Sequence, residues 1–110
     1  MRPYSIAPLD GCAFGGTVEG YDLRAAIGDA GAVANLRADM ERHKLLVFRG
    51  QTELSGEDHI ALSEALGSLD HGLHRPHPRA PHPCLLRVSN IEEEGFVMVG
   101  VSGWHVDGGM

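Results

Sequence analysis

The segment from residue 71 to residue 83 limits the fold of this chain more than any other, because it holds four of the six prolines. Proline fixes φ and removes a backbone donor, so the segment is predicted to be loop or polyproline-like chain. Regular elements must therefore lie before and after it. Four of the seven histidines also fall here, at His71, His74, His77 and His82.

An amphipathic helix is predicted from Gly31 to His43, because apolar residues recur there at helical spacing. Its apolar stripe consists of Val33, Leu36 and Met40, and its polar face consists of Arg37, Asp39, Glu41 and Arg42. A polar face of this kind is expected to lie in solvent.

A buried strand is predicted from Lys44 to Phe48, a short apolar run closed by Arg49 and Gly50. Arg49 itself is expected to pair with an acidic neighbour or to lie in solvent, with anion binding as the alternative. Ser55, followed by Asp58 three residues later, predicts the start of a second helix. Gly67 is a natural end for that helix.

Extended chain is predicted at both ends of the sequence. Tyr4 to Leu9 and Cys12 to Val18 are expected to be extended, with a bend at Gly15 and Gly16. After the proline-rich segment, strands are predicted over Leu85 to Ser89 and Phe96 to Val101, with a solvated turn at residues 92–95 between them. The fold class is therefore α+β, mainly β. Because the last strands would be unpaired edges, we expect an incomplete domain.

Composition excludes several classes of protein. With 110 residues the chain suffices for one small domain, and its net charge of −6 argues against nucleic acid or an anionic membrane as the main partner. No stretch approaches the roughly 20 apolar residues of a membrane span. The start of the chain lacks the apolar core of a signal peptide, so a cytoplasmic location is expected, with Cys12 and Cys84 as reduced thiols.

His105 and Asp107 are the residues that most directly suggest chemistry. Side chains at positions i and i+2 of a strand point to the same face, so an imidazole and a carboxylate would converge on one point. Two of the three ligands in a two-histidine, one-carboxylate iron site are presented in this way. The pair alone is a weak signal, since solvated polar residues often have the same spacing.

Several segments give this pair a context, and they follow one another over almost the whole chain. They are Ala7 to Gly11, Gly20 to Leu23, Leu46 to Gln51 (LVFRGQ), Ala61 to Leu69, Val88 to Asn90 (VSN) and Trp104 to Asp107 (WHVD). In their order and spacing they resemble the N-terminal part of the taurine dioxygenase (TauD/TfdA-like) family. LVFRGQ and WHVD together are fairly specific, whereas neither is specific alone.

The resemblance implies an iron(II)- and 2-oxoglutarate-dependent dioxygenase that hydroxylates a small, anionic organic substrate with O2. Residues 1–110 would be the N-terminal part of its double-stranded β-helix (jelly-roll) domain, with two flanking helices, ending just after the metal motif. His105 and Asp107 would be the first two iron ligands. The third ligand and the arginine that binds 2-oxoglutarate lie downstream in the family, so no residue of this chain is assigned to them.

The resemblance also assigns a substrate-binding role to His77, which lies nearest to a family histidine that holds an anionic substrate. The family member that uses taurine has a tyrosine and an asparagine where this chain has Ala80 and Val101, which argues against taurine itself. The alternative is that the four histidines of this loop are exposed polar residues without a binding role. Trp104 is expected either to form a wall of the site or to pack as a core aromatic.

Two hypotheses of different classes follow. In the first, the chain is a truncated piece of a dioxygenase, poorly soluble and inactive alone, and whether the full-length protein forms a homo-oligomer stays open. In the second, the chain is a catalytically dead remnant that binds a protein partner through an unpaired β edge.

Overall fold

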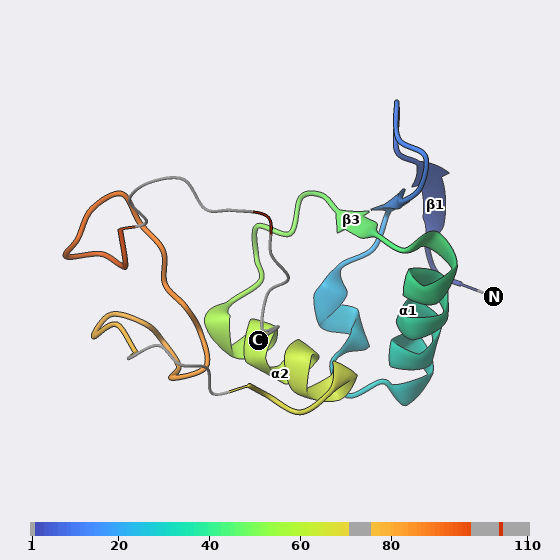
Figure 1. Cartoon of the computed structure of the whole chain (residues 1–110). Helices are drawn as coiled ribbons and strands as arrows, with labels where there is room; N and C mark the ends of the chain where they lie inside the picture. Colours follow the sequence, from blue (N-terminus) through green and yellow to red (C-terminus); the bar gives the residue numbers. More distant parts are fainter. Residues whose placement is uncertain (1, 71–75, 98–103, 105–110) are drawn as a thin grey trace. The chain divides into compact units, whose positions relative to one another are not determined.

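The computed structural model describes residues 2–70, 76–97 and 104. The chain divides into two compact units, Met1–Gly67 and Ser68–Met110, which we call the first and the second unit (Figure 1). Each is described by itself.

A three-stranded sheet with the order β1-β2-β3 forms part of the first unit. β1 (Ser5–Pro8) pairs antiparallel with β2 (Gly16–Glu19), and β2 pairs in parallel with β3 (Leu46–Phe48). All three strands lie within the segments predicted to be extended or overlap them closely. The bend predicted before β2 is also present: Gly15 has a φ of 97°, and a Cβ at Gly16 would lie 2.4 Å from Ile6 Cγ2.

Helices α1 (Ala30–His43) and α2 (Gly56–Leu66) confirm the two predicted helices. Asp29 caps the start of α1 by accepting a hydrogen bond from the Ala32 N–H, and Lys44 ends it in the left-handed region at a φ of 68°. At the start of α2 the predicted capping box forms in both directions between Ser55 and Asp58.

The apolar core of the first unit lies where three helical elements meet. A short 3₁₀ helix, η1 (Leu23–Ala26), contacts both α1 and α2, and Figure 1 shows it between them. Ala26 of η1, Leu36 of α1 and Leu62 of α2 are buried against one another. The core is small, so each of its apolar side chains matters to stability.

The polar face predicted for α1 is wrong at one position, because Asp39 is only 4% exposed. Arg2 Nε donates to both carboxylate oxygens of Asp39, at 2.9 and 2.6 Å, and Tyr4 Oη donates to one of them at 2.6 Å. These bonds explain the burial, because a charge leaves water at acceptable cost when it is paired and hydrogen-bonded. Met40, predicted to lie on the apolar stripe, is 45% exposed instead.

The Arg2–Tyr4–Asp39 cluster changes the acidity of its members. Burial raises the pKa of the Asp39 carboxyl, but the hydrogen bonds from Arg2 and Tyr4 outweigh it and leave that pKa below its ordinary value. Burial, together with the hydrogen bond to Asp39, raises the pKa of Tyr4 to about 12. The tyrosine ring also lies 4.9 Å from the ring of Tyr21. The cluster ties the start of the chain to α1.

The second unit has little regular structure in the part that is described. Of the strand predicted over Leu85 to Ser89, only Val88 takes part in a β bridge, which it forms with Phe96. The turn predicted between them is present, since the Glu94 N–H donates to the Ile91 carbonyl at 3.0 Å. Residues 98–101 of the second predicted strand lie outside the described residues.

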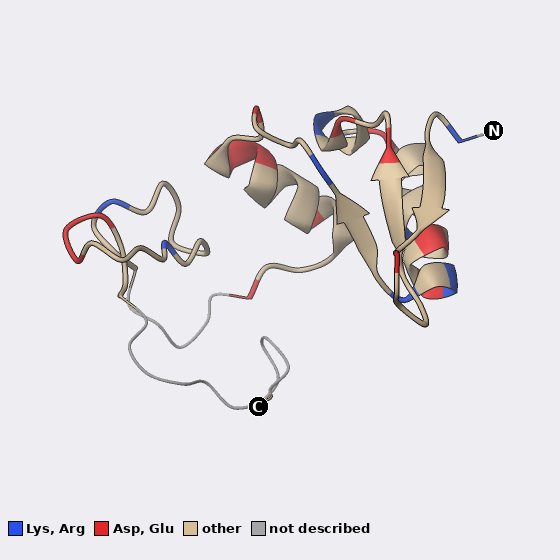
Figure 2. Cartoon of the chain, turned by 90° about the horizontal axis from the view of Figure 1, so that it is seen from above, with Lys and Arg blue, Asp and Glu red and all other residues tan. Residues whose placement is uncertain are grey.

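The described residues form an α+β structure in which helix exceeds strand. α1 has 14 residues and α2 has 11, against strands of 4, 4 and 3 residues. Figure 2 shows charges of both signs on α1 and acidic positions on α2. A jelly roll stays a prediction. No helix within the described ranges is both long and apolar enough to cross a membrane.

Candidate functional site

The predicted metal ligands His105 and Asp107 lie outside the described residues, so their convergence stays a prediction. Trp104 beside them is described, and its side chain is fully exposed, which does not support packing as a core aromatic. Within residues 2–70, 76–97 and 104, no three or more histidine, cysteine, aspartate or glutamate side chains gather as a metal site would require. This observation leaves the predicted iron site untested.

Two His-Pro turns organise the proline-rich segment. In each turn the histidine carbonyl accepts a hydrogen bond from the N–H three residues later, from Ala80 to His77 at 2.9 Å and from Leu85 to His82 at 3.0 Å. In each turn the histidine Nδ1 also accepts from the N–H two residues later, at 3.1 Å from Arg79 and at 3.0 Å from Cys84. Proline suits the position directly after each histidine because it supplies no N–H and has the φ of a turn.

His77 differs from His82 in a second, long-range contact. Its Nε2 lies 3.0 Å from the carbonyl oxygen of Glu92, across 15 residues of sequence. A carbonyl only accepts and an N–H only donates, so both contacts of His77 require the neutral ring with its proton on Nε2. The ring also meets Phe96 edge to face, with 5.4 Å between the ring centres. His77 therefore joins the first His-Pro turn to the turn at residues 92–95.

Glu94 is a second organising residue, although the sequence suggested only a solvated turn at that place. Its carboxylate pairs with Arg79, and with Arg87 at 3.4 Å. The Arg87 side chain also donates to the Glu94 carbonyl, while the Arg87 carbonyl accepts from the Phe96 N–H at 2.7 Å. A Cβ at Gly95 would lie 2.7 Å from that same carbonyl, so only glycine fits this close approach.

A cavity of about 620 Å³ opens beside these residues, within the second unit. We call it the His77 cavity, and it is lined by His77, Glu92, Gly95, Phe96 and Val97. The structure thus places the predicted substrate-binding histidine at a cavity. Both ring nitrogens of that histidine already have backbone partners.

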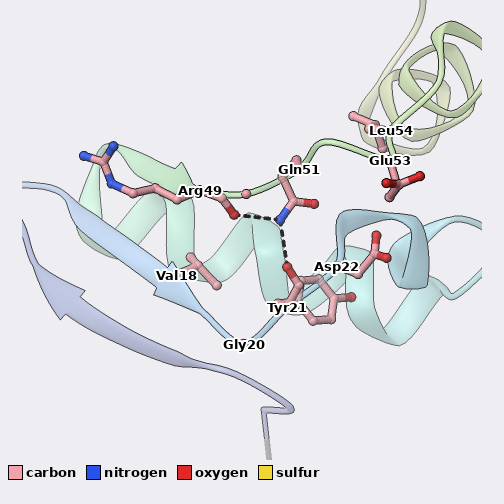
Figure 3. Close-up of a pocket in the computed structure, with 9 residues that line it drawn as sticks. Val18, Gly20, Tyr21, Asp22, Arg49, Gln51, Glu53 and Leu54 are labelled. Atoms are coloured by element: carbon pink, nitrogen blue, oxygen red, sulfur yellow. Dashed lines mark hydrogen bonds between the residues drawn. The ribbon is translucent and has the colours of Figure 1, made fainter.

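A smaller cavity of about 240 Å³ in the first unit lies between the residues after β2 and those after β3 (Figure 3). The Gln51 amide group closes it by donating to the carbonyls of Tyr21, at 2.9 Å, and Arg49, at 3.2 Å. The Leu23 N–H donates to Gln51 Oε1 at 3.0 Å. The Arg49 guanidinium points away from these groups in Figure 3. Gln51 is therefore a structural link between two loops.

No disulfide is present among the described residues. Cys12 is exposed and Cys84 is half-buried. The roles of Glu94 and Gln51 were not predicted from the sequence. Gln51 lies in the LVFRGQ motif, but the motif does not indicate its hydrogen bonds to another loop, and no local pattern marks Glu94. The two His-Pro turns, by contrast, carry a local signal, since proline follows the histidine in both.

Comparison with known proteins gives one distant similarity. The chain is 28% identical to Pentalenolactone F synthase of Streptomyces avermitilis over 111 aligned positions. The match covers 96% of this chain and 36% of that enzyme, so the chain spans about a third of the length of the curated relative that it matches. No protein-family model matches the chain.

Proposed function

We propose that this chain is the N-terminal part of an iron(II)- and 2-oxoglutarate-dependent dioxygenase that oxidises a small organic substrate. The observation that carries the proposal is the similarity to Pentalenolactone F synthase along nearly the whole chain. At the coarser level this similarity supports a dioxygenase-like oxidoreductase. The order of the sequence motifs, which ends in WHVD, supports the finer assignment.

In this proposal His105 and Asp107 hold the iron. Imidazole nitrogen and carboxylate oxygen fit the donor set of a two-histidine, one-carboxylate site, which binds iron(II) and leaves positions open for small molecules. The metal, with 2-oxoglutarate and O2, supplies the oxidising chemistry, and the protein supplies binding and orientation. No residue of this chain matches the third ligand or the 2-oxoglutarate arginine, so we expect these 110 residues alone to form no succinate.

The charge of the substrate is not part of the proposal. The sequence suggested an anion held by His77, and that role stays a prediction. The geometry argues against it, because the Arg79 N–H and the Glu92 carbonyl already use both ring nitrogens.

Metal binding tests the proposal without requiring turnover. Manganese(II) binds such donor sets and broadens the NMR signals of nearby nuclei. Titrated into the 15N-labelled chain, it is expected to broaden the amide signals of His105 and Asp107 first. His105→Ala and Asp107→Ala should each weaken this binding about tenfold or more, because each removes one of only two protein ligands. His59→Ala, which removes an exposed histidine of α2, is the matched control and should change nothing.

Broadening that survives both substitutions would contradict the proposal. So would broadening centred on the histidines of residues 71–82, because the metal would then prefer the proline-rich segment. No broadening at His105 or Asp107 would also contradict it.

A second candidate is the interaction module with an unpaired β edge, and one observation favours it. Among the described strands β3 pairs only with β2. Leu46 and Phe48 of β3 also line an open apolar groove of about 660 Å³. An exposed strand edge beside an apolar groove is a common site for adding a strand. The manganese titration separates the two candidates, since this module has no use for His105 or Asp107.

A further inference from the structure

The His77 cavity has no histidine nitrogen to offer an anion. Nδ1 accepts from the Arg79 N–H at 3.1 Å, and Nε2 lies 3.0 Å from the Glu92 carbonyl. A ligand carboxylate or sulfonate would need an N–H of the ring. The neutral ring has a single N–H, on Nε2, and this N–H donates to the Glu92 carbonyl. Breaking this bond would leave the carbonyl without its partner, which costs binding energy.

The charges around the cavity also disfavour an anion. Among the described residues that line the cavity, Glu92 is acidic and none is an arginine or a lysine. The two arginines in the described part of the second unit, Arg79 and Arg87, both pair with Glu94. Among the described residues, an anion in the cavity would therefore meet the like charge of Glu92 and no arginine or lysine that lines the cavity.

The other described residues that line the cavity form a largely apolar wall. The imidazole of His77 and the ring of Phe96 pack edge to face, and Val97 lies beside them. Gly95 adds no side chain, so the wall on that side is backbone. Surfaces of this kind bind apolar groups of ligands, with few polar contacts.

From these three observations we infer that the His77 cavity binds an uncharged, largely apolar group of a ligand, with His77 holding the wall in place as a positioning residue. The ligand is the substrate if the proposed dioxygenase function is correct, and only that identification rests on the proposed function. The expected group is neutral and apolar, where the sequence suggested an anionic one.

Two probes of nearly the same shape test the inference, because one is neutral and the other carries a negative charge. Cyclohexanecarboxamide and cyclohexanecarboxylate are titrated separately into the 15N-labelled chain at a pH above about 6.5, the ordinary pKa of histidine. The amide signals of Gly95, Phe96 and Val97 report binding. The carboxamide is expected to shift them saturably and to bind about fivefold more tightly than the carboxylate, because Glu92 repels the carboxylate.

Glu92→Gln should remove most of this preference, because it removes the charge and keeps the side-chain size and the backbone carbonyl that His77 contacts. Glu93→Gln is the matched control: Glu93 is the adjacent acid, does not line the cavity, and should leave the preference intact. Phe96→Leu should weaken the binding of both probes.

Three results would overturn the inference: tighter binding of the carboxylate, no saturable shift with either probe, or a preference that Glu92→Gln leaves unchanged. No metal or 2-oxoglutarate is present in this experiment. Its failure is therefore distinguishable from failure of the dioxygenase proposal, which the manganese titration tests at His105 and Asp107.

Discussion

The two units of this chain are held together by different kinds of interaction. The first unit has two capped helices, a three-stranded sheet and a shared apolar core. The described part of the second unit has a single β bridge, and its turns are joined through the side chains of His77, Arg87 and Glu94. Apolar burial acts over many atoms at once, whereas each of these polar contacts depends on one or two atoms.

This difference explains why the sequence predicts the two units unequally well. The start of α2 was predictable because a capping box needs only Ser55 and Asp58, three residues apart. The segment from Leu85 to Ser89, predicted to be a strand, forms only the bridge from Val88 to Phe96, because a strand also needs a partner along its length. Most of the strand predicted from Phe96 onward lies outside the described residues and stays a prediction. Alternating or apolar residues permit a strand and do not by themselves form one.

The largest expected effect is on the first unit, through Leu36→Ala. Leu36 is 6% exposed and packs against Ala26 and Leu62. Removing it leaves a cavity, and the free energy of unfolding should fall by about 2–4 kcal/mol in a urea titration followed by circular dichroism. Met40→Ala on the same helix is the control and should stay within about 0.5 kcal/mol, because Met40 is largely exposed. Equal losses for the two variants would contradict the assigned core.

A smaller effect is expected for Asp39→Asn, which weakens the link between the start of the chain and α1. The free energy of unfolding should fall by about 1–2 kcal/mol. This loss is at the low end of the range for hydrogen bonds to charged groups, because the Arg2 side chain is 41% exposed and solvent screens its charge. Asp39 also shows why burial was mispredicted: its partners Arg2 and Tyr4 lie 37 and 35 residues away in the sequence.

The same cluster predicts how stability depends on pH. The pKa of Asp39 is lowered by folding, so its contribution is present above the ordinary carboxyl pKa of 3.8 and is lost as the pH falls through the lower folded value. The pKa of Tyr4 is raised, so its contribution is complete below pH 10 and is lost as the pH rises toward 12. Unfolding measured across pH should show both slopes, and Asp39→Asn should reduce both. Slopes unchanged in that variant would contradict the cluster's role.

The smallest effects are expected in the second unit, where they separate the two His-Pro turns. His77→Phe keeps a ring beside Phe96 and removes two side-chain hydrogen bonds, those to the Arg79 N–H and the Glu92 carbonyl. His82→Phe removes one side-chain hydrogen bond, which its ring accepts from the Cys84 N–H. Amide hydrogen exchange should show a local loss of about 1–2 kcal/mol for the first variant and about half of that for the second. The protected amides of α1 should be unaffected in both. A larger loss from His82→Phe would show that the link to Glu92 contributes nothing.

The candidate site was predictable only in part, for the same physical reason. His77 was singled out from a resemblance, and the structure does place it at a cavity. Its hydrogen bond to Glu92 was not predictable, because that bond crosses 15 residues without a repeating pattern. His105 and Asp107 lie two residues apart, and side chains at this spacing share one face of a strand. Their convergence can therefore be predicted from the local sequence, and the manganese titration tests it.

The protonation pattern of His77 is the most direct test of how the second unit is built. 15N NMR of the imidazole rings distinguishes the two neutral forms of histidine. In the neutral form of the ring, we expect His77 to carry its proton almost entirely on Nε2, while the exposed His59 shows a mixture of both neutral forms. A mixture at His77 would mean that its ring is not fixed by Arg79 and Glu92. The ring nitrogens would then be available to an anion, as the sequence first suggested.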